Sequence, residues 1–296
     1  MVLLKKLSDL KHVTFSFRLR LLFFQVRKTL HLKYQESDYN LNSFLTTHLL
    51  RHNGILLEEN KNTYTSVFGF NGNHSCRITL RKPPSSDFAV YDQIFVLQEY
   101  QPLVDLVKEN ELDNNRSLNI IDAGGNVGLS SIFLNNAFPG SRFGIIEPDT
   151  ENFVILEKNV KQNNFLVCTL IKGGVWDKNI GLQLNRNFRD GNDWSLSVTE
   201  TLENSLLHGF SITTLMKKLQ FDIIDILKID VEGSEKQLFS NATHAAEFLS
   251  RTKYISIEIH DEFDCREEIN DCLQKNNFEF ILKDGLTIGV NKNLVN

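Results

Sequence analysis

Ile120-Ile-Asp-Ala-Gly-Gly-Asn-Val-Gly128 is the stretch that decides the fold. An apolar run ends at an acid, Asp122, and a glycine-rich turn then leads into a stretch with helical spacing. Glycine adopts positive φ angles and lets the backbone approach a ligand closely, and Asn126 is one of the few other residues that tolerate the left-handed region. The free N–H groups of the following helix favour a negative group such as a carboxylate. The stretch therefore predicts a ligand-binding turn between a strand and a helix.

A second acid ends the next expected strand. Ile145-Ile-Glu147 closes that strand, 25 residues after Asp122. An acid in this place accepts both ribose hydroxyls of an adenosine-containing cofactor. The turn and the acid together predict a nucleoside-cofactor site made of Asp122, Gly124, Gly125, Asn126, Gly128 and Glu147.

The rest of the chain supplies the sheet that such a site needs. From about residue 118, short β-branched runs alternate with amphipathic stretches, which is the pattern of repeated βα units around a parallel sheet. We expect a doubly wound, Rossmann-like α/β fold with a mostly parallel seven-stranded sheet. Its strands are expected at 118–123, 142–147, 166–175, 224–231, 254–260, 278–282 and 286–290, and its helices at 128–137, 150–163, 213–220, 234–248 and 265–276.

Two regions fall outside this alternation. Residues 176–212 are rich in Asn, Asp and Gly, with strand-like pieces at 180–184 and 195–198, and insertions of this length usually serve as functional lids or extra hairpins. Trp176 and Trp194 flank the insert and either stack on a ligand or pack in a core. We expect residues 1–86 to form an N-terminal extension, a basic helix followed by a small strand-rich region, before a domain at 87–296. That domain is expected to begin with a helical stretch at 87–108.

The extension begins with a basic segment. Residues 1–33 carry eight Lys or Arg against a single acid, with several Phe and Leu among them. Arg18 and Arg20 interrupt any signal-peptide core, and no apolar run approaches the ~20 residues of a membrane span. Such a helix either lies on an anionic membrane surface or packs on its own domain or a partner subunit, such as a second copy in a homo-oligomer. A cytoplasmic location, with or without membrane association, is expected.

Composition narrows the range of partners. The formal net charge of −5 argues against general nucleic-acid affinity, which usually rests on a basic surplus. The four cysteines form no C-x-x-C pair and no His cluster sits beside them, so a structural zinc site is not expected. We expect reduced thiols in an ordinary globular core.

The glycine spacing distinguishes between nucleoside cofactors. A dinucleotide fingerprint needs G-x-G-x-x-G, and no frame of Gly124, Gly125 and Gly128 supplies all three glycines. An Asp as the last strand residue before the turn is instead typical of S-adenosylmethionine binders, where it meets the methionyl end. S-adenosylmethionine is therefore the expected cofactor, and an NAD-dependent oxidoreductase on the same sheet is the alternative enzyme.

Two motifs resemble those of a known family. Asp122-Ala-Gly-Gly-Asn-Val-Gly128 resembles the first motif of FkbM-type methyltransferases, and Leu227-Lys-Ile-Asp-Val-Glu-Gly-Ser-Glu235, preceded by Ile212-Thr-Thr-Leu215, resembles their second. The resemblance covers about residues 88–290, and residues 1–85 show none. It implies a class I methyltransferase fold with a final antiparallel strand. It also implies O-methylation, commonly of hydroxyls on saccharides or polyketide-like natural products.

The second motif carries the candidate catalytic residues. Asp230 and Glu232 lie where a strand ends, and ligands bind outside the carboxyl ends of strands in open α/β sheets. Glu258 and His260 lie two apart near the end of the next strand and share one face. Methyl transfer needs a base that takes the proton of the nucleophile. We expect Asp230 and His260 to supply the base and the substrate orienter, with Glu232 beside them.

Other roles for these residues stay open. Asp230 could pair with Lys228 or cap the next helix. Glu232 and Glu235 could also cap that helix, and His260 could be an ordinary hydrogen-bonded histidine. An acidic cluster of Asp230, Glu232, Glu258 and Asp261 could bind Mg²⁺, although no metal is expected. The resemblance implies an O-methyltransferase, and we expect it to act on a sugar hydroxyl in glycan or natural-product assembly. A non-catalytic binding protein on the same fold is the remaining alternative.

Overall fold

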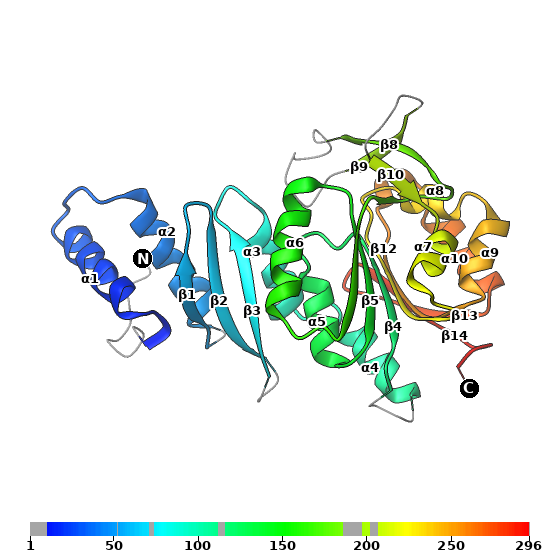
Figure 1. The fold of residues 1–296 in the computed structure, drawn as a ribbon, viewed down its shortest axis with the longest axis horizontal. Helices are drawn as coiled ribbons and strands as arrows, with labels where there is room; N and C mark the ends of the chain where they lie inside the picture. Colours follow the sequence, from blue (N-terminus) through cyan, green and yellow to red (C-terminus); the bar gives the residue numbers. More distant parts are fainter. Residues whose placement is uncertain are drawn as a thin grey trace. The chain divides into compact units, whose positions relative to one another are not determined.

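The computed structural model describes residues 11–51, 53–70, 74–111, 116–185, 197–201 and 207–295 (Figure 1). The chain forms two compact units, residues 1–82 and 83–296. The sequence placed this division four residues later, after residue 86.

The N-terminal unit joins a helical part to a small antiparallel sheet. Helices α1 (Phe15–Thr29) and α2 (Glu36–Phe44) lead through a π-helical turn (Leu45–Leu49) into strands β1 (Ile55–Glu59), β2 (Thr63–Phe70) and β3 (His74–Arg81), which pair in that order. Phe44 stacks on Tyr64 with ring centroids 4.6 Å apart, which packs the helices on the sheet. Arg20 of α1 forms ion pairs with Asp38 and Glu59, so one polar cluster connects α1 to α2 and β1.

A seven-stranded sheet forms the centre of the second unit. Its order is β13-β14-β12-β11-β4-β5-β6, and only β14 runs antiparallel to its neighbours. This confirms the expected doubly wound α/β fold of the class I methyltransferase type. The strands are β4 (Asn119–Ala123), β5 (Arg142–Glu147), β6 (Val167–Lys172), β11 (Ile224–Ile229), β12 (Thr252–Glu258), β13 (Phe278–Lys283) and β14 (Leu286–Asn291).

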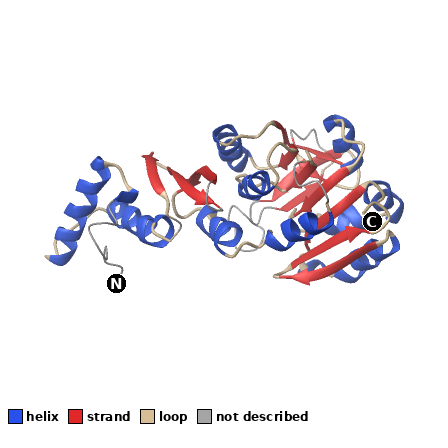
Figure 2. Cartoon of the chain, turned by 90° about the horizontal axis from the view of Figure 1, so that it is seen from below, coloured by secondary structure: helices blue, strands red, loops and turns tan. Residues whose placement is uncertain are grey.

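Helices cover both faces of this sheet (Figures 1 and 2). On one side lie α4 (Gln101–Asn110), α5 (Leu129–Ala137) and α6 (Thr150–Gln162). On the other side lie α7 (Ile212–Leu219), α8 (Glu235–Phe239), α9 (Ala242–Leu249) and α10 (Arg266–Lys275). The central strand β11 is buried along its whole length, as expected for a parallel strand between two helical layers.

Two helical regions differ from their expected form. The stretch at 87–108 is divided into α3 (Asp87–Tyr91), a π-helical turn (Asp92–Val96) and α4. The helix expected at 234–248 is two helices, because Asn241 starts α9 by accepting hydrogen bonds from the backbone N–H groups of Thr243 and His244.

The insert builds a second, smaller sheet. Strands β7 (Gly174–Val175), β8 (Ile180–Asn185), β9 (Ser197–Glu200) and β10 (Leu207–Phe210) pair in the order β7-β10-β8-β9. The strand expected at 166–175 ends at Lys172, and its remainder becomes β7 of this sheet. Trp176 packs with Leu182 and Val198 and donates from Nε1 to Glu200 at 2.9 Å, so it belongs to the core of the insert. Trp194 lies outside the described residues.

None of the helices in the described part of the chain combines the length and the apolar character that crossing a bilayer requires.

Candidate functional site

The turn after β4 packs directly on the loop after β11. Gly124 and Gly128 have φ angles of 85° and 86°, and Asn126 between them has a φ of 46°. A Cβ atom on Gly124 would lie 1.7 Å from the carbonyl oxygen of Asp230. Because that contact is with backbone, no side-chain rotation relieves it, and the first glycine of the motif is needed for packing as well as for its φ angle.

Glu147 holds the other side of the turn. Its Oε2 accepts from the backbone N–H of Asn126 at 2.8 Å and its Oε1 from that of Asp149 at 2.9 Å. Burial raises the pKa of Glu147 to about 7, although these two N–H groups act in the opposite direction. A carboxylate oxygen accepts more than one hydrogen bond, so Glu147 can hold the turn and still accept from a ligand's hydroxyls.

Asp122 lies below the turn rather than at its surface. The carboxylate is fully buried and accepts from the hydroxyls of Ser130 and Ser131 at 2.7 and 2.6 Å. Its other oxygen lies 3.1 Å from the Nζ of Lys228. Asp122 is absent from the lining of both neighbouring pockets. In this structure it supports the turn from below, and its contact with the methionyl end stays a prediction.

Lys228 joins the two sequence motifs. Its buried ammonium donates to the carbonyl oxygen of Gly124 at 2.6 Å and lies 3.3 Å from the Oδ2 of Asp230. Burial alone would lower the pKa of Lys228, but the charges of Asp122 and Asp230 outweigh burial and raise it. Lys228 therefore stays charged, and the pairing of Asp230 with Lys228 that the sequence left open is present.

The loop after β11 is organised by a buried acid that starts α8. Glu235 is fully buried and accepts from the backbone N–H groups of Val231 and Gly233 at 3.1 and 2.7 Å. These bonds hold the loop while Glu232 adopts a φ of 49°. Glu235 therefore fixes the loop that carries Asp230 and Glu232, whereas the N-terminus of α8, with Ser234 at its N-cap, has no side-chain cap of the kind considered for Glu235.

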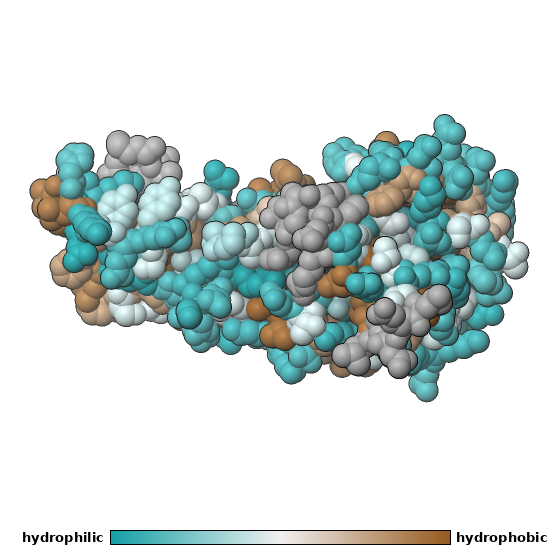
Figure 3. Space-filling view, turned by 90° about the horizontal axis from the view of Figure 1, so that it is seen from above, coloured by the Kyte–Doolittle hydropathy of each residue, from teal (hydrophilic) through white to brown (hydrophobic). Residues whose placement is uncertain are grey.

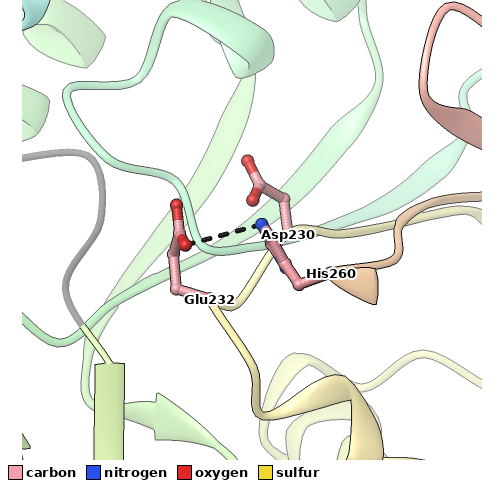
Figure 4. Close-up of side chains that lie close together, drawn as sticks. All are labelled: Asp230, Glu232 and His260. Atoms are coloured by element: carbon pink, nitrogen blue, oxygen red, sulfur yellow. Dashed lines mark ion pairs between the residues drawn. The ribbon is translucent and has the colours of Figure 1, made fainter. Parts of the chain in front are cut away.

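His260 is held on the same acid. Its Nδ1 lies 2.9 Å from the Oε1 of Glu235. Its Nε2 lies 3.4 Å from the Oε2 of Glu232 (Figure 4) and 3.9 Å from the Oε1 of Glu258. Burial acts to lower the pKa of His260, but the carboxylates of Glu235 and Glu232 raise it to about 9. A histidine that is charged at neutral pH suits orientation and charge balance better than proton abstraction.

Two further acids face the site. Glu258 ends β12, and the charge of Asp230, together with burial, raises its pKa to about 7. Glu99 precedes α4, and burial, together with the charge of Glu258, raises its pKa to about 7 as well. Sequence reasoning considered Glu258 only as a member of an acidic cluster that could bind Mg²⁺. It missed Glu99, because Glu99 lies in a short link whose fold the local pattern does not reveal.

Two adjoining pockets meet at the turn. Residues common to both linings are Gly124, Asn126, Asp230 and Glu232. The Glu147 pocket also has Ile146, Glu147, Pro148, Asn152, Gly173, Gly174, Val175, Val198, Val231 and Ser234 in its wall. The Glu258 pocket also has Val90, Gln93, Ile94, Glu99, Tyr100, Gly125, Leu129, Ser130, Lys228 and Glu258 in its wall.

The junction of the pockets has an unused polar atom. The Oδ1 of Asn126 is buried and has no hydrogen-bond partner among the residues that the structure describes. A buried acceptor of this kind usually has a partner in the functional state. The residues present therefore fit a polar nucleoside cofactor, with its ribose at Glu147 and its charged end near the turn.

One group of side chains also has the arrangement of metal ligands. Asp230, Glu232 and His260 each offer one ligand atom, and these atoms lie within 4.8 Å of one another. Carboxylate oxygen and imidazole nitrogen suit several divalent cations. Asp261, part of the acidic cluster considered from the sequence, instead forms a two-point ion pair with Arg266 at the surface.

Comparisons with solved structures return methyltransferases. A METTL16 methyltransferase domain is 13% identical over 65% of this chain, with a TM-score of 0.41, and the chain spans just under two thirds (66%) of that domain. TYW2 of M. jannaschii, solved with AdoMet, is 14% identical over 79% of this chain and 86% of its own, with a TM-score of 0.34. A methyltransferase from Geobacter sulfurreducens is 16% identical over 69% and 88%, with a TM-score of 0.39.

The family match is the stronger finding. Among curated proteins, none matches the chain. The model of the methyltransferase FkbM domain matches residues 122–281, more than half of the chain. That range begins at Asp122 and includes Glu147, the loop after β11 and His260. The chain therefore belongs to the FkbM family of S-adenosylmethionine-dependent methyltransferases.

Proposed function

We propose that the chain transfers a methyl group to a hydroxyl of a saccharide, in glycan or natural-product assembly. When bound, S-adenosylmethionine supplies an electrophilic methyl on a sulfonium. The protein must then hold the two reactants in line and remove the proton of the hydroxyl.

The acceptor class rests on one observation, the density of carboxylates in the Glu258 pocket. Glu99, Asp230, Glu232 and Glu258 all line it, beside the ammonium of Lys228. Carboxylates accept hydrogen bonds from hydroxyls, and a sugar presents several hydroxyls at once. An apolar acceptor would leave these acids desolvated without partners, which is unfavourable.

The same acids supply a base. Asp230 borders both pockets, so it stands where the reacting groups would meet. Two neighbouring carboxylates hold one proton more firmly than either does alone, and this coupling raises the pKa of Glu258 toward neutrality. We assign proton removal to Asp230, with Glu258 as its partner. His260 and Glu235 then act as positioning residues that hold Glu232 and the loop.

The test is a panel of acceptors assayed by release of S-adenosylhomocysteine. Sugar nucleotides and short oligosaccharides should support turnover, and mass spectrometry of the product should place the methyl on oxygen. Asp230→Asn should abolish most of that turnover, whereas Asp271→Asn, an exposed change on α10, should not. Turnover with amines but with no hydroxyl compound would overturn the acceptor class while leaving the family unaffected.

A further inference from the structure

Helix α1 has an apolar face that the residues described by the structure leave exposed. Its buried residues are Leu21 and Phe24. Six large apolar residues of α1 and its end are instead 39% to 72% exposed, and these are Phe15, Leu19, Leu22, Phe23, Val26 and Leu30. Figure 3 shows hydrophobic side chains at the surface over the helices of this unit.

The exposed residues form one continuous stripe. At 3.6 residues per turn, the six positions fall within an arc of about 100°. Leu21 and Phe24 lie about 150° from the centre of that arc, on the opposite side of the helix. Arg20 is held by Asp38 and Glu59, which fixes the rotation of α1 about its axis. The stripe therefore faces away from the unit's own core and is too wide to be a chance exposure of single residues.

The positive charge of the N-terminal unit indicates what kind of partner covers the stripe. Residues 10–35 contain six Lys or Arg and no Asp or Glu. The N-terminal unit, residues 1–82, carries 13 Lys and Arg against 5 Asp and Glu, a net charge of +8, whereas residues 83–296 carry 19 against 32, a net charge of −13. Arg27 in α1 and Lys33 just after it are exposed, so cations accompany the exposed apolar side chains.

We propose that α1 lies in the interface of an anionic membrane, with its stripe among the acyl chains and its cations at the headgroups. An amphipathic helix with Phe and Leu on one face and Arg and Lys beside them has the pattern of interfacial helices. The apolar stripe and the positive charge of the N-terminal unit together favour an anionic bilayer over an acidic protein, because a bilayer accommodates both at once. The helix lies on the surface, since it is too short and too polar to cross.

Vesicle co-sedimentation of the full chain tests this proposal. Vesicles of phosphatidylcholine with 30% phosphatidylserine should sediment the wild type, and pure phosphatidylcholine should sediment much less. Raising the salt from about 50 to 500 mM should release most of the bound protein, since the Debye length shortens several-fold. The double variant Phe15→Gln/Phe23→Gln should bind at least about tenfold more weakly, the scale expected for two lost aromatic anchors.

A matched control distinguishes binding through the stripe from nonspecific adsorption of exposed apolar residues. Leu166→Gln removes an apolar side chain that is 73% exposed on the other unit, and it should sediment like the wild type. Unchanged affinity for S-adenosylhomocysteine in every variant shows that the methyltransferase unit is folded. Two results would overturn the proposal. One is equal sedimentation of the wild type and the double variant. The other is a wild-type dimer in light scattering that the double variant converts to monomer, which would assign the stripe to a second copy of the chain.

Discussion

Replacing Glu147 by glutamine probes the cofactor site without any need for an acceptor. In the free protein each oxygen of Glu147 already accepts one backbone N–H, from Asn126 and from Asp149. Glutamine keeps the shape of the side chain but has only one oxygen, so its NH₂ group must face one of these two donors. The variant therefore loses an acceptor for the ribose and strains the turn that binds the rest of the cofactor.

The size of the effect follows from the bonds that are lost. A hydrogen bond to a charged group is worth about 1.5–3 kcal/mol, which corresponds to roughly 10- to 150-fold in affinity. Glu147→Gln should weaken S-adenosylhomocysteine binding at pH 8 by about that factor. Isothermal titration calorimetry measures the change directly. Glu151→Gln alters an exposed acid in the first turn of the same helix, α6, and should leave the affinity unchanged.

The pH dependence gives the reasoning a second, independent test. Because burial raises the pKa of Glu147 to about 7, the free site is largely protonated at pH 5.5 and ionised at pH 8. The ionised form accepts both ribose hydroxyls, so wild-type affinity should rise with pH, by up to about tenfold per unit below pH 7. Glu147→Gln should remove this part of the dependence.

The stability of the free protein should respond in the opposite direction. A carboxyl group whose pKa is raised by folding stabilises the fold fully below its unfolded pKa, and that contribution is lost as the pH rises through about 7. Glu147→Gln should therefore reduce the loss of thermal stability between pH 6 and pH 8. A folded Glu147→Gln variant with wild-type affinity and the wild-type pH profile would refute the assignment of Glu147 to the ribose.

Three further outcomes are expected. Asp230→Asn should lower kcat by roughly 10²–10⁴ in the acceptor assay while cofactor affinity changes little, since the amide keeps the shape but cannot take the proton. Activity should survive dialysis against EDTA, and a loss that Mg²⁺ or Mn²⁺ restores would instead assign Asp230, Glu232 and His260 to a metal ion. Gly124→Ala should lower the free energy of unfolding by at least about 3 kcal/mol, because its Cβ would meet the Asp230 carbonyl, whereas Gly140→Ala, with a φ of 83° but open space around it, should cost only about 1–2 kcal/mol. Urea denaturation compares the two glycine variants.

The parts of the fold that repeat a strong local pattern were predictable from the sequence. The strand ending at Glu147 has the expected bounds, and β4 differs by one residue, because apolar runs in buried parallel strands are nearly continuous. The division of 166–175 into β6 and β7 was not predictable. Val175 looks like the end of one strand, but its neighbours are set by β10, which is more than 30 residues away along the chain.

The candidate site shows the same limit. The residue types of the two motifs indicated which side chains would gather. Glu147, Asp230 and Glu232 do line one pocket, and His260 contacts Glu232. The environment of each group could not be inferred from spacing. The sequence left His260 beside Asp230 as a candidate for the base. Its Nδ1 lies on the buried Glu235, a contact between residues 25 positions apart that raises the pKa of His260.

Lys228 explains why the two motifs occur together in one chain. A buried ammonium is costly unless carboxylates and a carbonyl surround it, and Asp122, Gly124 and Asp230 provide that surrounding. Conversely, Asp122 at the end of β4 is buried without charge compensation unless a cation reaches it from β11. The first motif therefore depends on the second for its electrostatic balance, although the two are separated by about a hundred residues. Lys228, which has no catalytic role in this scheme, fixes the cofactor turn and the candidate base Asp230 relative to each other.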